Sequence, residues 1–278
     1  MSARASLLGV AVALALGACR REEAPAPFTP PRDSVLLPIA DRGWAPGAPK
    51  EGWCGEASVQ MVALHAGAWL PQPYINAIGR STHVDLWEDD VPIALAKAGL
   101  AFHRYPGPRG DGRGSIADFV GWVVAQVRAG RPVIVGAKLF PTEHPDWDVD
   151  HLMPVVGFTP THLVFNSNMD EGQVRVAYAA LGGRDGVSFA SPTNRRFGFA
   201  VTGRAHPPEH PVRLTDASDG GTTLLAHVEG LPAGAWRLVA EGPDAGEAWD
   251  FATDGGEALV PVTVPADAPR VFSVLPAP

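Results

Sequence analysis

The sequence predicts an α+β protein in which helices and strands share the first three quarters of the chain and short strands fill the last quarter. Two segments, 54–66 and 115–130, carry apolar residues at helical spacing. The segments 132–137, 151–158 and 162–168 are short and mostly apolar, which is typical of strands. The last quarter alternates short apolar segments with glycine, proline and aspartate, as in a small β-sandwich.

The composition is that of a globular protein with room for one large or two ordinary domains. The chain has 278 residues, of which 46% are hydrophobic and 19% charged. Its formal net charge is -8, and no basic stripe interrupts this acidic character. We therefore expect no nucleic-acid partner.

The N-terminal segment 1–19 has the features of an export signal. Arg4 precedes an apolar run from 7 to 16 that is too short for a permanent membrane span. The sequence Leu16-Gly17-Ala18-Cys19 resembles the lipobox of bacterial lipoproteins, in which the cysteine is lipidated. This resemblance implies an exported protein that is anchored through Cys19 to the cell envelope, at the outer membrane or the periplasmic face. The alternative is an ordinary signal peptide with a coincidental cysteine.

Three further parts follow the signal segment. Residues 20–32 are proline-rich and predict an extended tether. Residues 33–205 form the main α+β domain, and residues 206–278 form the small β-domain, with a run of histidine and proline at the boundary. The β-domain either helps to hold substrate, cell wall or partner, or serves only for packing. With Cys19 acylated, Cys54 is the one remaining thiol, so no disulfide can form within the chain.

Cys54 stands at the start of the first predicted helix. The residues at steps of four, three and four along this segment predict one buried face, made of Ala57, Met61, Leu64 and Ala68. A thiol in the first turn lies near unpaired backbone N–H groups and the positive end of the helix dipole, which favours its thiolate. The sequence therefore predicts a nucleophile at Cys54. The alternative is a small buried apolar residue.

A nucleophilic cysteine needs a base, and the base needs an orienting group. Among the nine histidines, His65 lies about 16 Å further along the same helix and is excluded. His151 begins a predicted strand, and Asn166 lies on the hairpin partner of that strand, within reach across the pair. Asn168 shares the strand face of Asn166 and is the reserve candidate for the orienting group.

Two polar loops lie near these residues in the sequence. We expect the segment 81–90 to be a solvated connection, with the wall of a cleft as the alternative. The acidic segment 142–150 contains aspartates and a histidine, but it lacks the glycine turn of a calcium-binding loop and a zinc-binding H-E-x-x-H order. We therefore expect no metal there.

Taken together, these segments resemble the papain-like cysteine peptidases, and most closely their bacterial branch related to the double-glycine leader peptidases. The matching segments are Trp53–Ser58, Pro132–Val135, His151–Phe158 and Phe165–Ser167. The resemblance covers roughly residues 33 to 205. It implies a papain-like fold, with the cysteine on a helix and the histidine and asparagine on an antiparallel sheet.

The resemblance also implies a cysteine peptidase or related hydrolase that acts on a peptide or other amide. Cys54 would be the nucleophile, His151 the general base and acid, and Asn166 the orienting residue, with neither a cofactor nor a metal. One departure concerns the oxyanion hole, to which the family contributes a glutamine about six residues before the cysteine. Here that position is Ala48, so the second oxyanion donor is unassigned.

Two other functions stay open. The run Cys54-Gly55-Glu56-Ala57-Ser58 is similar to the nucleophile region of phytochelatin synthases, which implies a transferase that uses the same thioester. A non-catalytic binding module that has kept the fold and lost the oxyanion hole is the second alternative.

Overall fold

The computed structural model describes residues 28–49, 52–80, 82–107, 115–141, 148–169, 172–190, 196–216, 222–242 and 246–278. The predicted signal segment 1–19 with its lipidation residue Cys19, most of the tether, and 142–147 of the acidic loop lie outside these residues. None of the helices in the described ranges is long and apolar enough to span a membrane.

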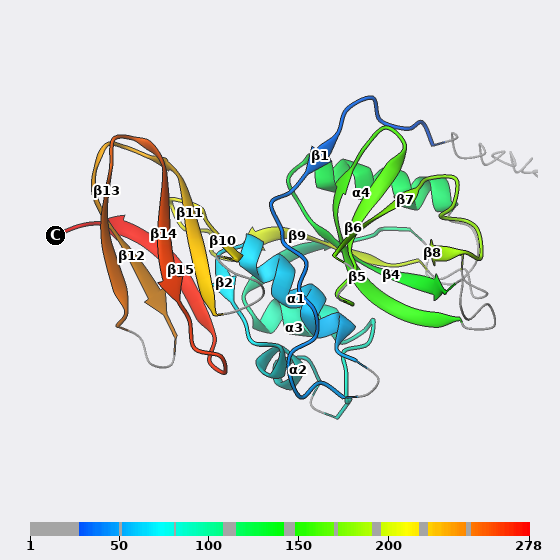
Figure 1. The fold of residues 1–278 in the computed structure, drawn as a ribbon, viewed down its shortest axis with the longest axis horizontal. Coiled ribbons are helices and arrows are strands. Elements are labelled where there is room, and N and C mark those ends of the chain that lie inside the picture. The colour runs from blue at the N-terminus through cyan, green and yellow to red at the C-terminus, as the bar shows by residue number, and fades with distance from the viewer. Residues whose placement is uncertain are drawn as a thin grey trace, which may run out of the picture.

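The α+β class is confirmed, because the described residues form four helices and antiparallel sheets. The helices are α1 (Cys54–His65), α2 (Gln72–Arg80), α3 (Val91–Lys97) and α4 (Ile116–Arg128). The two helices that the sequence predicts at 54–66 and 115–130 are α1 and α4. Figure 1 shows the helices and the larger sheet on one side of the molecule and the C-terminal strands on the other.

The larger sheet holds the strands of the predicted main domain. They are β1 (Val35–Leu36), β3 (Leu100–Arg104), β4 (Val133–Phe140), β5 (Val149–Phe158), β6 (His162–Asn166), β7 (Gln173–Ala177), β8 (Gly186–Ser188) and β9 (Gly198–Arg204). Their order is β3-β9-β4-β5-β6-β7, while β1 pairs with β5 and β8 with β4. The predicted hairpin of β5 and β6 is confirmed. The strands β7, β8 and β9 were not predicted.

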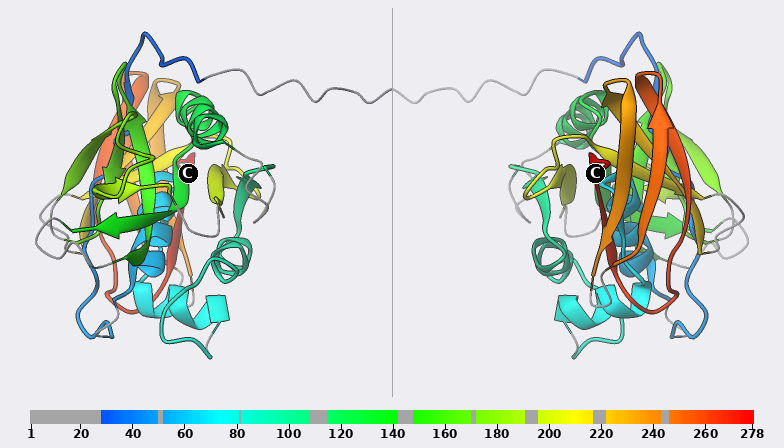
Figure 2. Two further views of the ribbon diagram at one scale, coloured as in Figure 1. Left: turned by 90° about the vertical axis from the view of Figure 1, so that its right-hand side faces the viewer. Right: turned by 90° about the vertical axis from the view of Figure 1, so that its left-hand side faces the viewer.

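Both faces of this sheet are covered. Helix α4 begins at a capping box of Ser115 and Asp118, and its Phe119 packs with Val133 of β4 in one core. The neighbouring Ile134 points into a second core, which is shared with α1, α2 and α3. The sheet therefore has a core on each face. Figure 2 gives two views along the long axis of the molecule.

Helix α1 is more deeply buried than its sequence predicts. Every residue from Gly55 to Leu64 is buried, because Met61 faces the first core, Val62 the second, and Leu64 the core of the β-domain. The prediction of a single buried face was therefore too narrow. Ala68, placed on that face, lies beyond the helix in the short strand β2 (Ala68–Trp69), which follows a left-handed Gly67.

The short strands expected in the C-terminal part are present. They are β10 (Val212–Asp216), β11 (Thr223–Leu231), β12 (Gly234–Glu241), β13 (Ala248–Thr253), β14 (Gly256–Thr263) and β15 (Arg270–Pro276). They form two sheets, with orders β10-β11-β14 and β13-β12-β15-β2, that enclose one core around Leu224, Leu238 and Phe272. These strands therefore form a small sandwich.

The sandwich and the main domain are joined by more than the chain between them. Strand β2, which lies between α1 and α2 in the sequence, pairs with β15, and Trp69 enters the core of the sandwich. The buried Arg42 forms an ion pair with Asp216 of β10. At the other end of the main domain, Phe28 contacts Tyr178 edge to face, so the last residues of the predicted tether lie against the domain.

Candidate active site

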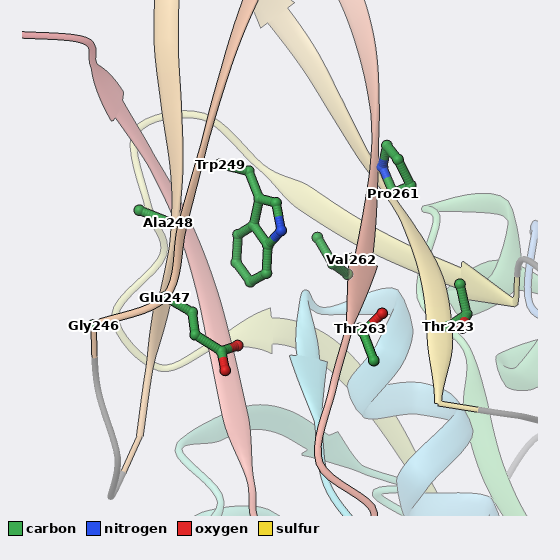
Figure 3. A pocket seen from close by; sticks show the side chains of 8 residues that line it. All are labelled: Thr223, Gly246, Glu247, Ala248, Trp249, Pro261, Val262 and Thr263. Carbon is green, nitrogen blue, oxygen red and sulfur yellow. The ribbon is translucent and has the colours of Figure 1, made fainter.

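Two hollows of about 530 Å³ each are candidates for a functional site. The first lies in the sandwich, where the edge strands β13 and β14 diverge and Trp249 projects between them (Figure 3). Among the described residues that line it, Glu247 is the only ionisable one. The second lies in the main domain and contains both Cys54 and His151, so only the second combines a nucleophile with a base.

The cleft at Cys54 is lined by parts of the chain that lie far apart in the sequence. One wall is formed by residues 85–88, and the other by residues 136–138 of β4 and 150–152 of β5. Ser188, Phe189 and Phe197 complete the lining. The preferred interpretation of the segment 81–90 as a solvated connection is therefore wrong for residues 85–88, because these residues form a cleft wall.

Cys54 is the first residue of α1, as predicted, and its sulfur lies beside β5. The backbone N–H of Leu152 donates to Sγ at 3.4 Å. Burial nevertheless raises the pKa of the Cys54 thiol to about 11, and the charges of Glu56 and Asp85 act in the same direction. The expectation of a favoured thiolate is thus reversed, because burial outweighs the helix N-terminus and the hydrogen bonds to the sulfur.

Glu56 is a fully buried carboxyl two residues after Cys54. Its Oε1 accepts a hydrogen bond of 2.7 Å from Asn76 of α2, while its Oε2 is buried without a partner among the described residues. Burial raises the pKa of Glu56 to about 7. The same region anchors the cleft wall, because the Trp53 indole donates to the carbonyl of Val84 at 2.9 Å.

His151 is buried on β5 and lines the cleft beside Cys54. Its Nε2 lies 2.9 Å from the carbonyl oxygen of Ser167. Because a carbonyl oxygen can only accept, Nε2 carries the proton and Nδ1 is the basic nitrogen. Burial lowers the pKa of His151 below its usual value, so the ring is neutral at pH 7 and able to accept a proton.

The orienting partner of His151 is not the one that was predicted. The side chain of Asn166 is directed away from His151, with Nδ2 donating to the carbonyl oxygens of Ile39 at 3.1 Å and Ala40 at 3.0 Å. Its Oδ1 accepts from Gln173. The expected contact between Asn166 and His151 is therefore replaced by the backbone carbonyl of Ser167, which no side-chain pattern could have indicated.

The reserve candidate Asn168 lies close to the site but serves another purpose. Its side-chain Nδ2 donates to the carbonyl oxygen of Leu152 at 2.9 Å, and its Oδ1 accepts from the indole of Trp44 at 3.1 Å. Asn168 has a left-handed φ of 51°, which asparagine tolerates. It therefore fixes the backbone that carries His151 and does not touch the ring in this arrangement.

The missing glutamine is not supplied from elsewhere in the described residues. Ala48 lies in a shallow hollow with Trp44 and Asn168. Gln60 and Gln72 are buried and bonded to backbone carbonyls, at Leu70 and Gly43 respectively. The backbone N–H of Cys54, in the first turn of α1, has no hydrogen-bond partner within the helix.

The chain matches no model of a known protein family and no curated protein.

Gly55 lets α1 approach the cleft wall closely. A Cβ at this position would lie 2.7 Å from Cβ of Leu86 and 3.1 Å from Cδ1 of Leu152. We expect Gly55→Ala to lower the free energy of unfolding by about 1–3 kcal/mol, because the wall must shift. Urea denaturation measures this loss.

Gly121 of α4 provides the matched control. A Cβ there would lie 3.7 Å from its nearest neighbour, Cδ2 of Phe28, which is ordinary contact. Gly121→Ala should therefore be neutral or stabilise the protein by up to about 1 kcal/mol through helix propensity. Equal stabilities of the two variants would show that the contact at Gly55 does not restrict the packing.

Proposed function

We propose that this protein is a papain-like cysteine hydrolase, a peptidase or amidase of the cell envelope, that works through a thioester on Cys54. The observation that carries the proposal is the presence of Cys54 and His151 in one cleft, with the Leu152 N–H directed at the sulfur. Their placement on a helix N-terminus and on an antiparallel sheet agrees with the arrangement that the sequence resemblance implies.

The proposed reaction begins from a neutral thiol and a neutral imidazole. As Sγ attacks the amide carbonyl, the thiol proton passes to His151, whose other nitrogen is held by Ser167. The imidazolium then protonates the leaving amine, and the neutral ring takes a proton from the water that hydrolyses the thioester. Lipidation at Cys19 and anchoring to the envelope belong to this proposal as well, on the basis of the sequence alone.

One alternative has support of its own. The raised pKa of Cys54 and the replacement of the oxyanion glutamine by Ala48 favour a binding module that has kept the fold without catalysis. Loss of one oxyanion donor slows comparable enzymes by roughly a hundredfold to a thousandfold, so a weak hydrolase is still expected.

The test is acylation of the full chain by an activated acyl ester, p-nitrophenyl acetate. We expect a burst of p-nitrophenolate and an acetyl group that peptide mapping places on Cys54. Cys54→Ala should abolish the burst, and His151→Ala should slow it by about a hundredfold to ten-thousandfold. Addition of glutathione as an acyl acceptor separates the hydrolase from the transferase. A burst of equal size in Cys54→Ala would contradict the proposal, and no acylation of the wild type would favour the binding module.

A further inference from the structure

Trp87 is an exposed aromatic residue in the wall of the catalytic cleft. It is 58% exposed, and it lines the hollow that contains Cys54. One face of its indole stacks on the imidazole of His83, with centroids 4.1 Å apart and planes 26° apart. Its Nε1 donates to Oδ1 of Asp85 at 3.0 Å. The ring is thus fixed on one side and at its polar edge, and its other face is open to a ligand.

The support beneath this ring is itself buried. Asp90 is fully buried, and its Oδ2 lies 2.6 Å from Nδ1 of His83 and 3.0 Å from the backbone nitrogen of Trp87. Its Oδ1 forms an ion pair with Arg80 at 2.9 Å. A surface tryptophan without a function needs no such support. The arrangement therefore holds the indole in place before any ligand arrives.

The charges near the ring favour a cation. Among the described residues of the cleft lining, Asp85 and Asp150 carry carboxylates and Lys138 carries an ammonium group. The Lys138 ammonium lies 2.9 Å from Asp148 and 2.8 Å from Asp150, so acidic side chains already neutralise it. The Asp85 carboxylate thus lies beside an electron-rich indole face, and both groups attract a positive charge.

We propose that Trp87, with Asp85 beside it, forms a subsite for a cationic group of the substrate, an ammonium or guanidinium group on a peptide. This deepens the proposed function and rests on it, because the peptide is the one whose amide Cys54 attacks. The cation lies over the open face of the indole, and the neighbouring carboxylate balances its charge. The subsite gives the cleft a preference for lysine-like or arginine-like side chains over apolar side chains of the same size.

The test measures binding without turnover. Cys54→Ala protein is titrated calorimetrically with acetyl-Ala-X-Ala-amide peptides in which X is lysine, norleucine or glutamate. We expect the lysine peptide to bind about three- to thirtyfold more tightly than the norleucine peptide, and the glutamate peptide to bind most weakly. Trp87→Leu should remove most of the preference, Trp87→Phe should keep part of it, and Asp267→Asn, an exposed position in the sandwich, should leave it unchanged.

Equal binding of the lysine and norleucine peptides would overturn the proposal, and so would a preference that survives both Trp87 variants. Tighter binding of an uncharged chitooligosaccharide that is lost in Trp87→Leu would overturn it too, in favour of a sugar platform. Circular dichroism confirms that each variant is folded. Because binding is measured without Cys54, a cation preference together with a catalytically inert wild type would refute the hydrolase and leave the subsite standing.

Discussion

Alkylation of Cys54 by iodoacetamide is expected to become about tenfold faster with each pH unit between about pH 7 and pH 10, without a plateau. The reason is that only the thiolate reacts, and burial with the nearby charges of Glu56 and Asp85 raises the pKa of this thiol to about 11. A thiol with the usual pKa of about 8.5 would level off within this range. Quantifying the carbamidomethylated Cys54 peptide by mass spectrometry gives the rate.

Variants of the two acidic neighbours test the cause of this shift. Glu56 has a pKa of about 7 and is therefore ionised where Cys54 titrates, so Glu56→Gln should lower the pKa of Cys54 and speed alkylation at pH 8. Asp85→Asn should act in the same direction with a smaller effect, since Glu56 contributes more than Asp85. Asp254→Asn, in the distant turn between β13 and β14, is the matched control.

A different outcome would change the mechanism. Fast labelling near pH 6 that levels off early and disappears in His151→Ala would mean that the resting enzyme holds a thiolate beside an imidazolium. The neutral pair described above predicts that His151→Ala leaves the alkylation profile nearly unchanged, while acyl transfer from a substrate is strongly slowed. The two measurements together therefore separate a preformed ion pair from general-base catalysis.

Helices α1 and α4 were predictable because their signals are local. The apolar spacing of α4, its capping box and the glycines after α1 and α4 depend on residues within a few turns of one another. The burial of α1 on all sides was not predictable, because it depends on the sandwich core around Leu64 and on strand β2. A two-residue strand that pairs with a segment 200 residues away leaves no periodicity in the sequence.

The side chains of the candidate site could be predicted from the sequence, but the groups that surround them could not. Cys54 and His151 carry distinctive chemistry, and the structure brings them into one cleft. The partner of the ring is a backbone carbonyl, that of Ser167, and any residue type supplies such a group. The direction of the shift in the Cys54 pKa was not predicted for a similar reason. The helix start favours the thiolate, but the burial that raises the pKa depends on tertiary packing, which the local sequence does not specify.

Replacement of Arg42 by methionine is expected to lower the free energy of unfolding by about 3–5 kcal/mol. Nε of Arg42 donates to Asp216 at 3.1 Å, a second bond joins Nη2 to the other carboxylate oxygen, and the guanidinium lies over the Trp69 ring. The side chains of Arg42 and Asp216 are 5% and 11% exposed, so the variant leaves a nearly buried carboxylate without its cation. Urea denaturation at pH 7 measures the loss.

The surface ion pair of Arg237 and Asp250 serves as a control, because it shows what an ion pair contributes to the free energy of unfolding without burial. This pair also has two hydrogen bonds, of 2.6 and 2.9 Å, but both side chains are exposed. Arg237→Met should therefore lower the free energy of unfolding much less than Arg42→Met. The double variant Arg42→Met/Asp216→Leu should recover much of the loss, because it removes the stranded charge together with the pair. Equal losses in the free energy of unfolding for Arg42→Met and Arg237→Met would contradict this expectation. The contact between the domains would then be stabilised by β2 and its apolar contacts, and the buried ion pair would serve only to align the two domains.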